Sequence, residues 1–372
     1  MLKVVADQNI PMASEVFSAF GPVTLVDGRA LSDTDLCDAD ILLVRSVTEV
    51  NEALLNRSAV RFVGSATAGF EHIDRGYLRD RGIYFSLASG ANAQSVVEYV
   101  FAALAVTGER LENLLDGEQS LGLIGYGNVG RRLVDTAKSL DIRIKTFDPF
   151  TSTTQFSADL KEVLQCDVVS LHCELTSGGA HPTQHLISRE VLKGLSKDQL
   201  LINAARGGIV DNAALLSFCE KASAPALILD CWENEPNIDR RLIPFCHIAT
   251  PHIAGYSTDG KWRATQMLFD DAARLFGLEM DRAPFPEREC IQANAAGPRA
   301  GVIRDAISCV YDIKADDARF RIAAQANLTS TWFDDLRRQY PVRRELAEGR
   351  VSSVDGALSD EVIKAFRLRL ED

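Results

Sequence analysis

The strongest constraint on the fold is a glycine-rich segment, Gly125-Tyr126-Gly127-Asn128-Val129-Gly130. The apolar run Leu121–Ile124 precedes it directly, and a stretch with helical apolar spacing follows it. The first glycine permits a tight turn, the second lets the backbone approach a pyrophosphate, and the third lets helix and strand pack closely. A strand, this turn and a helix in that order predict a dinucleotide-binding unit of an α/β fold, with an ordinary tight turn as the alternative.

An acidic residue follows the next predicted strand. Asp148 comes after the run Arg143–Phe147, close to the spacing of about 20 residues from the third glycine that a ribose-binding acid shows. A carboxylate at this position accepts hydrogen bonds from the ribose hydroxyls and repels a 2′-phosphate. Pro149 stands where an enzyme for NADP often has a basic residue. We therefore predict NAD as the cofactor.

Apolar, β-branched runs alternate with helical stretches as far as Gly255, a pattern typical of parallel sheets connected by helices. The first predicted sheet comprises Lys3–Ala6, Val23–Val26, Ile41–Val44, Arg61–Val63 and Ile83–Phe85. The second comprises Leu121–Ile124, Arg143–Phe147, Asp167–Leu171, Leu200–Asn203, Ala226–Leu229 and His247–Thr250. We expect a long helix at Ala93–Val106 between the two series, and a helix at Trp262–Leu278 that returns to the first. Asp281–Gly301, rich in proline and alanine, is predicted to be a linker, followed by a charged, mostly helical tail.

The composition limits the kinds of partner that the chain is expected to bind and the compartment in which it is expected. The net charge of −12 argues against nucleic acid, and no apolar stretch is long enough to span a bilayer, so we expect neither nucleic-acid nor membrane binding. The chain opens without a signal-peptide pattern, and the expected compartment is the cytoplasm. The eight cysteines form no Cys-x-x-Cys pair, which favours buried core residues over a disulfide framework. Pro182 lies between His181 and His185 and favours a loop over a helical metal-binding face, so we predict no metal site.

Three polar clusters stand just past the ends of predicted strands. They are Asn203-Ala204-Ala205-Arg206-Gly207-Gly208, Asp230-Cys231-Trp232-Glu233-Asn234-Glu235-Pro236 and Thr250-Pro251-His252-Ile253-Ala254-Gly255. Because ligands bind outside the carboxyl ends of strands in doubly wound sheets, the clusters are candidates for one site. A histidine takes a hydroxyl proton near neutral pH, a carboxylate fixes its tautomer, and a guanidinium holds a substrate carboxylate. His252, Glu235 and Arg206 are the predicted catalytic residues. The alternatives are a loop-capping arginine, a solvated glutamate and a structural histidine.

These clusters, with the glycine turn and Asp148, resemble the D-2-hydroxyacid dehydrogenases in the same order along the chain. The resemblance covers about Met1–Leu278. It implies oxidation of a small anionic hydroxy acid with NAD, and it makes Arg206, Glu235 and His252 the catalytic triad. The implied cofactor contacts are Gly125, Gly127, Asn128, Val129, Gly130, Asp148, Thr176, Ala204, Arg206, Asp230 and Gly255.

Further segments resemble one branch of that family, whose members oxidise a phosphorylated hydroxy acid and carry a C-terminal dimerisation domain. The segments include Asp7-Gln8-Asn9-Ile10-Pro11, Val44-Arg45-Ser46-Val47-Thr48 and Gly64-Ser65-Ala66-Thr67-Ala68-Gly69. The implied substrate-binding residues are Arg45, Ser46, Thr67 and Tyr256. Arg45 is the first candidate for binding the phosphate, and Arg343-Arg344 is the second. The alternative for Arg343-Arg344 is a solvated helix face.

The predicted fold class is α/β, with two doubly wound parallel-sheet domains and a small C-terminal α+β dimerisation domain. A flavodoxin-like substrate domain is expected at residues 1–92 and 256–281, a Rossmann NAD domain at 93–255, and the dimerisation domain at 286–372. The expected partners are a phosphorylated hydroxy acid and a second copy of the chain. Two alternatives stay open: a phosphoglycerate- or lactate-type member of the family, and an NAD-sensing binding protein that keeps the fold and the triad.

Overall fold

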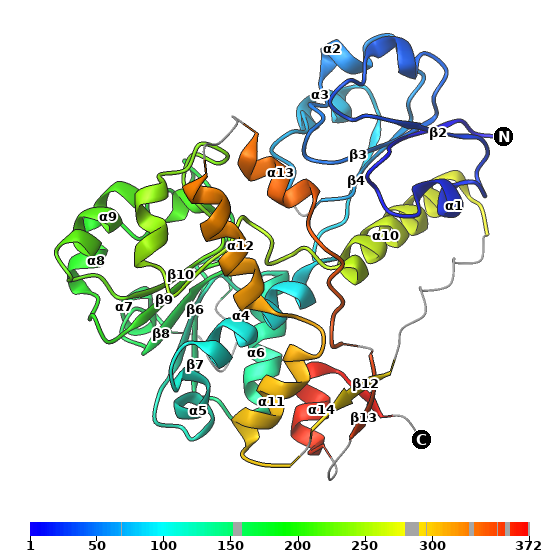
Figure 1. Cartoon of the computed structure of the whole chain (residues 1–372). Coiled ribbons are helices and arrows are strands. Elements are labelled where there is room, and N and C mark those ends of the chain that lie inside the picture. The colour runs from blue at the N-terminus through cyan, green and yellow to red at the C-terminus, as the bar shows by residue number, and fades with distance from the viewer. Residues whose placement is uncertain are drawn as a thin grey trace. The chain divides into compact units, whose positions relative to one another are not determined.

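The computed structural model describes residues 1–67, 69–151, 158–279, 290–294, 296–326, 331–347, 349–353 and 358–370. The chain forms two compact units (Figure 1). Unit 1 comprises Met1–Asn92 and Ser257–Glu287, and unit 2 comprises Ala93–Tyr256 and Arg288–Asp372. Among the described residues, no helix is both long enough and apolar enough to cross a membrane.

Unit 1 is built on a five-stranded parallel sheet. Its strands are β1 (Val4–Asp7), β2 (Val23–Val26), β3 (Ile41–Val44), β4 (Phe62–Ser65) and β5 (Tyr84–Leu87). They lie in the order β2-β1-β3-β4-β5, and every neighbouring pair is parallel. This is the strand order of flavodoxin-like folds, so the predicted class of this unit is confirmed. Its helices within the first 92 residues are α1 (Ala13–Phe17), α2 (Glu52–Leu55) and α3 (Arg75–Asp80), with a short 3₁₀ turn at Asp33–Leu36.

Helix α10 (Thr258–Phe276) completes the core of unit 1 from far along the chain. It begins four residues before the predicted start, because the Ser257 hydroxyl accepts a hydrogen bond from the Gly260 N–H and caps the helix. It ends at Gly277, which adopts a left-handed conformation. Phe269 of α10 packs edge-on against Phe17 of α1, with 5.9 Å between ring centroids. The returning helix is therefore an integral part of this unit.

Unit 2 is built on a six-stranded parallel sheet. Its strands are β6 (Leu121–Ile124), β7 (Ile144–Phe147), β8 (Val168–Leu171), β9 (Leu200–Asn203), β10 (Ala226–Leu229) and β11 (Ile248–Ala249), in the order β11-β10-β9-β8-β6-β7. The helices connecting them are α6 (Asn128–Ser139), α7 (Leu160–Val163), α8 (Arg189–Gly194) and α9 (Asn212–Glu220), preceded by α4 (Ala93–Val106) and α5 (Arg110–Leu115). Strands β7 and β8 lie on opposite sides of β6, so the strand order reverses there. Ligands bind at such switch points.

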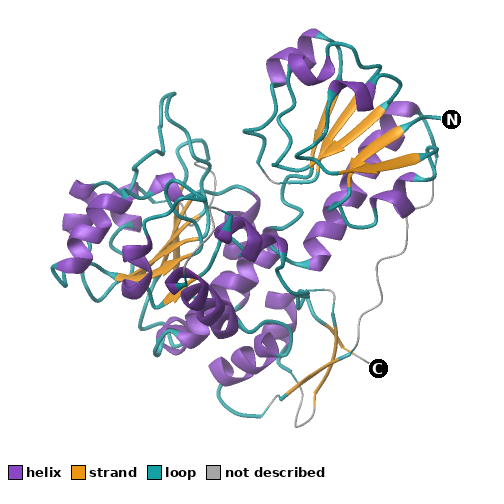
Figure 2. Ribbon diagram, turned by 45° about the horizontal axis from the view of Figure 1, so that its top comes forward, coloured by secondary structure: helices purple, strands orange, loops and turns teal. Residues whose placement is uncertain are grey.

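Alternate residues of these strands enter two separate cores, one on each face of the sheet. Leu121 and Leu123 pack with α4 and α6, whereas Ile124 and its neighbours in the adjacent strands pack with α8 and α9. Both faces are thus covered by helices, as Figure 2 shows. This explains why the strands of this sheet are apolar at successive positions and not only at alternate ones.

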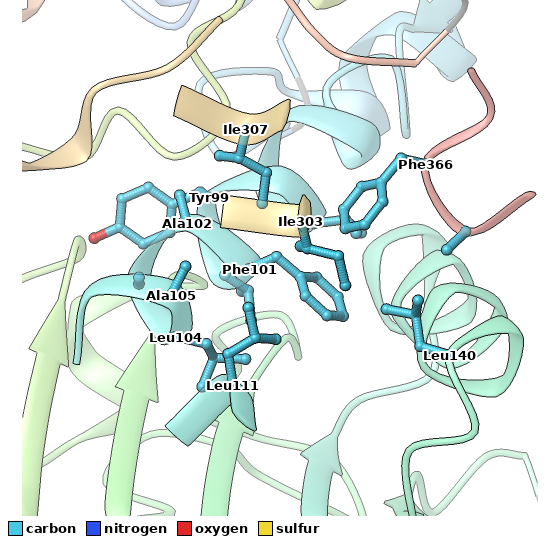
Figure 3. Packing of buried hydrophobic residues seen from close by; sticks show 14 of the residues in the cluster. Tyr99, Phe101, Ala102, Leu104, Ala105, Leu111, Leu140, Ile303, Ile307 and Phe366 are labelled. Carbon is cyan, nitrogen blue, oxygen red and sulfur yellow. The ribbon is translucent and has the colours of Figure 1, made fainter. Parts of the chain in front are cut away.

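Residues 288–372 are called the C-terminal segment, and the described part of this segment packs on the rest of unit 2. The segment contains β12 (Ile291–Ala293), α11 (Arg299–Ser308), α12 (Ile313–Gln325), α13 (Trp332–Arg338), β13 (Arg350–Ser353), α14 (Asp360–Phe366) and β14 (Arg369–Leu370). Its strands form a small parallel sheet in the order β12-β13-β14. Ile303 and Ile307 of α11 pack with α4, and Phe366 of α14 meets Phe101 edge-on at 5.4 Å (Figure 3).

The prediction that Asp281–Gly301 is a linker was wrong for its second half. Residues 281–289 and 295 lie outside the described residues, but β12 begins at Ile291 and α11 at Arg299. A three-residue strand gives no measurable periodicity. Its pairing partner β13 is also distant in sequence, so no local pattern indicates the pairing.

Arg343 does not lie on a solvated helix face. Its side chain is buried, and it donates to the Ser95 carbonyl at 2.8 Å and to the Ala254 carbonyl at 3.2 Å. Its guanidinium stacks 3.6 Å from the centroid of the Tyr311 ring. Arg343 therefore fixes the C-terminal segment to the rest of unit 2. The solvated-face interpretation of this residue was wrong, and its predicted contact with the phosphate stays a prediction.

Glu98 of α4 also binds the C-terminal segment, and its side chain is buried. Its carboxylate accepts hydrogen bonds from the Leu346 N–H at 2.9 Å and the Ala347 N–H at 3.1 Å. Burial, and then the charge of Glu345, raises the pKa of Glu98 from 4.5 to about 7. The folded protein therefore holds the proton of Glu98 more tightly than the unfolded chain does.

This difference predicts a pH-dependent stability. Because the folded-state pKa of Glu98 lies above the unfolded value, its contribution to the free energy of unfolding is largest below pH 4.5 and is lost as the pH rises to about 7. In Glu98→Gln the stability should fall less across this range than in the wild type. Urea unfolding of wild type, Glu98→Gln and the exposed control Glu118→Gln at several pH values measures the slopes. Equal slopes for Glu98→Gln and the wild type would contradict the assignment.

Candidate active site

The predicted site residues of unit 2 follow the carboxyl ends of its strands. All six strands are parallel, so these ends lie at one edge of the sheet. The glycine turn follows β6 and Asp148 follows β7, on one side of the switch point. Arg206, Glu235 and His252 lie in the loops after β9, β10 and β11, which are neighbouring strands. The sheet therefore brings a cofactor-type turn and the three polar loops to the same edge.

The glycine turn after β6 leaves no room for side chains at two of its three glycines. Gly125 has φ +103°, and a Cβ there would lie 2.6 Å from the carbonyl carbon of His172. A Cβ on Gly130 would lie 2.1 Å from the Gly125 oxygen. At Gly127 a Cβ would meet no described atom within 4 Å. The start of α6 is therefore open to a ligand, and its amides and positive dipole end suit a pyrophosphate.

Asp148 is held beside this turn by the backbone. Its carboxylate accepts hydrogen bonds from the Tyr126 N–H at 2.8 Å and the Phe150 N–H at 2.9 Å. The first bond connects the predicted ribose-binding acid directly to the predicted pyrophosphate-binding turn. Thr176 lies half-buried in the loop after β8. Thr183 fixes it, since the hydroxyl oxygens of the two residues lie 3.3 Å apart. These features fit a bound NAD.

The structure joins Glu235 and His252 in one hydrogen-bonded pair. Glu235 Oε2 lies 2.6 Å from His252 Nδ1, and Glu235 Oε1 accepts from the Trp232 N–H at 2.7 Å. Burial alone would raise the pKa of Glu235, but the charge of His252 and these hydrogen bonds outweigh burial and hold the pKa below its usual value. The ionised carboxylate keeps the proton on Nδ1, so Nε2 is the nitrogen that remains for proton transfer.

Asp230 holds the turn that carries His252. His252 has a left-handed backbone conformation, with φ 57°. The buried Asp230 carboxylate accepts from the Thr250 hydroxyl and the Ile253 N–H, both at 2.7 Å, and from the Ala254 N–H at 2.9 Å. Burial raises the pKa of Asp230 against these stabilising contacts. The structure thus shows a positioning role for Asp230, and its predicted contact with the cofactor stays a prediction.

The Arg206 loop packs directly on the Glu235 loop. A Cβ on Gly207 would lie 1.9 Å from the carbonyl carbon of Trp232, so the two backbones are in contact. The Asn203 side chain closes the Arg206 loop, accepting from the Ala205 N–H at 3.2 Å and donating to the Arg206 carbonyl at 3.0 Å. The half-buried Arg206 guanidinium donates to the Ala205 carbonyl at 2.8 Å.

Cys231, Glu235 and His252 bring three potential metal ligands within 4.8 Å of one another. Apart from His252 Nε2, however, these ligand atoms are already engaged in hydrogen bonds. Glu235 and His252 bind each other, and the Cys231 thiol donates to the Ala205 carbonyl at 3.3 Å. Burial raises the pKa of Cys231 far above its ordinary value and keeps the thiol protonated. The chemistry of this set favours a hydrogen-bonded network over a metal centre.

The predicted substrate-binding residues divide between the two units. In unit 1, Arg45 and Ser46 follow β3, and Thr67 follows β4, which pairs with β3, so all three lie at the carboxyl edge of that sheet. Arg45 Nη1 lies 4.0 Å from Asp7 Oδ1. In unit 2, Tyr256 follows the His252 turn, and its N–H donates to the Ile253 carbonyl at 2.8 Å.

One residue of this region was not predicted from the sequence. Arg337 of α13 lies with its guanidinium 5.4 Å from the centroid of the Tyr256 ring. Its charge also contributes to the lowered pKa of Glu235. No local pattern identifies this arginine, because α13 carries several charged residues, and only the packing of the C-terminal segment places one of them here.

Comparisons with known proteins agree with this geometry. Residues 106–254 match the model of the D-isomer specific 2-hydroxyacid dehydrogenase NAD binding domain, and residues 284–365 match a domain of unknown function (DUF3410). The TT0316 protein from Thermus thermophilus has a TM-score of 0.63 at 23% identity, over 76% of this chain and 99% of its own. D-Lactate dehydrogenase from Aquifex aeolicus, solved with NAD and lactic acid, has a TM-score of 0.61 at 22% identity, over 74% and 96%. The fold and the site define an NAD-dependent D-2-hydroxyacid dehydrogenase.

Curated relatives narrow the family further. Erythronate-4-phosphate dehydrogenase of Tolumonas auensis is 41% identical over 372 residues, 98% of each chain. The enzyme of the same name from Marinobacter nauticus is 40% identical over 360 residues, 94% of each chain. The chain belongs to the erythronate-4-phosphate dehydrogenase family.

Two adjacent glycines give a sharp test of the loop packing. Gly207→Ala should lower the free energy of unfolding by roughly 1–3 kcal/mol or more, because its Cβ must displace the Trp232 backbone. Gly208→Ala is the control, since its Cβ would meet only side-chain carbons of Leu175, the nearest at 3.2 Å. Urea denaturation and steady-state rates compare the two. Equal stability of the two variants would show that the Arg206 and Glu235 loops are not packed as described.

Proposed function

We propose that the chain oxidises 4-phospho-D-erythronate to (R)-3-hydroxy-2-oxo-4-phosphooxybutanoate with NAD, a step in the biosynthesis of pyridoxal 5′-phosphate, the active form of vitamin B6. The observation that carries the proposal is the Glu235–His252 pair, at 2.6 Å, in the loops adjoining that of Arg206. Membership in the erythronate-4-phosphate dehydrogenase family supports the choice of substrate.

The residues of unit 2 have distinct tasks in this reaction. His252 Nε2 takes the proton of the C2 hydroxyl, and the Glu235 carboxylate stabilises the imidazolium that forms. Arg206 holds the substrate carboxylate with its guanidinium. Asp230 keeps the His252 turn in place. NAD, when bound, accepts the hydride that leaves C2, and the α6 amides and Asp148 would hold it.

The remaining contacts are part of the same proposal. The cofactor set is that predicted from the sequence, namely Gly125, Gly127, Asn128, Val129, Gly130, Asp148, Thr176, Ala204, Arg206, Asp230 and Gly255. Ser46, Thr67 and Tyr256 would bind the hydroxyl groups of the substrate, and Arg45 its phosphate. A homodimer held by the C-terminal segment, in the cytoplasm, completes the proposal.

NADH formation by the purified chain tests this function. We expect turnover of 4-phospho-D-erythronate to exceed that of 3-phosphoglycerate and D-lactate, with a 2-oxo acid supplied to reoxidise the cofactor. His252→Ala should lower kcat by about 10²–10⁴-fold, the usual contribution of a positioned acid–base group. His185→Ala is the matched control, because it breaks a similar histidine–glutamate contact, to Glu233 Oε1 at 2.6 Å, outside the proposed chemistry.

Other outcomes would redirect the assignment. Preference for 3-phosphoglycerate or D-lactate would keep the reaction type and reject the substrate. NAD binding without turnover of any hydroxy acid would reject the enzyme and favour an NAD-sensing protein. Equal losses in His252→Ala and His185→Ala would reject His252 as the base.

A further inference from the structure

We propose that Arg337 of the C-terminal segment is a substrate-binding residue and that its guanidinium holds the substrate phosphate. The inference rests on the proposed function and adds to it a residue from the segment that matches a domain of unknown function. Three features carry the inference: how α13 is anchored, what surrounds the guanidinium, and which charges of the substrate still need a partner.

Helix α13 is attached to the loop that carries Glu235. The Trp232 ring of that loop lies 5.5 Å from Phe320 of α12, and Phe320 stacks on Trp332 of α13 at 5.6 Å. Phe333, the next residue of α13, meets Phe320 edge-on at 6.1 Å. Trp232 is itself fixed, because its indole N–H donates to the Thr250 carbonyl at 2.8 Å. This aromatic cluster therefore fixes the position of Arg337 relative to the catalytic pair within a single unit.

The guanidinium of Arg337 is largely buried, and one of its N–H groups has no hydrogen-bond acceptor in the described part of the chain. Its side chain is only 25% exposed, and Nη1 lies 3.7 Å from Asp334. Its Nε is buried and has no hydrogen-bond partner among the described residues. The two Glu235 oxygens are instead bonded to His252 and the Trp232 N–H. A buried N–H without an acceptor is costly, and an anionic ligand would remove that cost.

The groups around Arg337 keep its guanidinium positively charged. Burial disfavours its charge, but Tyr256 and Glu235 outweigh burial and raise the pKa of Arg337. The ring of Tyr256, a predicted substrate-binding residue, lies under the guanidinium at 5.4 Å. In a chain with a net charge of −12, an anionic substrate needs such local cations.

The substrate of the proposed reaction has two anionic ends. Arg206 is assigned to the carboxylate, which adjoins the reacting carbon. The charges of Arg206 and Arg337 both act to lower the pKa of Cys231, which lies between strand β10 and Glu235, against the larger effect of burial. A guanidinium binds phosphate oxygens through two parallel hydrogen bonds, so Arg337 suits the phosphate.

A comparison of two substrates tests this role. In Arg337→Met, kcat/KM for 4-phospho-D-erythronate should fall by about tenfold or more, as expected when a charge-assisted hydrogen bond is lost. The value for D-erythronate, which lacks the phosphate, should stay nearly unchanged. Arg337→Lys should recover part of the preference for the phosphorylated acid. Arg338→Met is the matched control, because Arg338 lies on the same helix, is 66% exposed and pairs with Asp335.

Two results would overturn the proposal. One is an equal loss with both substrates, which would mean that Arg337 acts on the catalytic pair or the fold. The other is no loss with either substrate.

Calorimetric binding of 4-phospho-D-erythronate in the presence of NADH separates this proposal from the proposed function. If the wild type binds but does not turn over this acid, and binding is weaker in Arg337→Met, the reaction is overturned and the phosphate contact stands. If Arg337→Met binds as tightly as the wild type, the contact is overturned. If the wild type does not bind, both are overturned.

Discussion

The hydrogen bond between Glu235 and His252 is the interaction on which the site depends. It joins the loops after β10 and β11, and its 2.6 Å length requires both loops to be fixed. The Asp230 carboxylate fixes one of them by accepting from the Ile253 and Ala254 amides, and the Trp232 N–H fixes the Glu235 carboxylate. The parallel sheet supplies the frame, because it brings these loops to one edge and leaves the glycine turn on the other side of the switch point.

The C-terminal segment stabilises the same frame from outside the sheet. The Asp317 carboxylate of this segment accepts a hydrogen bond from the Ala249 N–H at 2.7 Å. This contact covers the edge strand β11. Arg343 donates to the Ala254 carbonyl, close to the His252 turn, and Phe320 packs on Trp232. A segment that matches a domain of unknown function thus contacts both catalytic loops, so changes in it should affect catalysis.

Local patterns in the sequence predicted most of the frame and the central residues. The strands of both sheets lie within two residues of the predicted runs, and α4 has the predicted bounds, because each has strong apolar patterning between turn residues. The glycine turn and the strand-end positions of Glu235 and His252 also follow from local chemistry. Strand β12, the burial of Arg343 and the placement of Arg337 depend on contacts between distant segments. Local periodicity carries no information on those contacts.

A double-mutant cycle between Glu235 and His252 tests the central claim most directly. It compares kcat/KM of the wild type, Glu235→Gln, His252→Ala and the double variant under one set of conditions. If the two side chains act as one unit, the double variant is no slower than His252→Ala, since Glu235 works only through the histidine. If the two losses multiply, Glu235 acts independently of His252, and the account of the site is wrong.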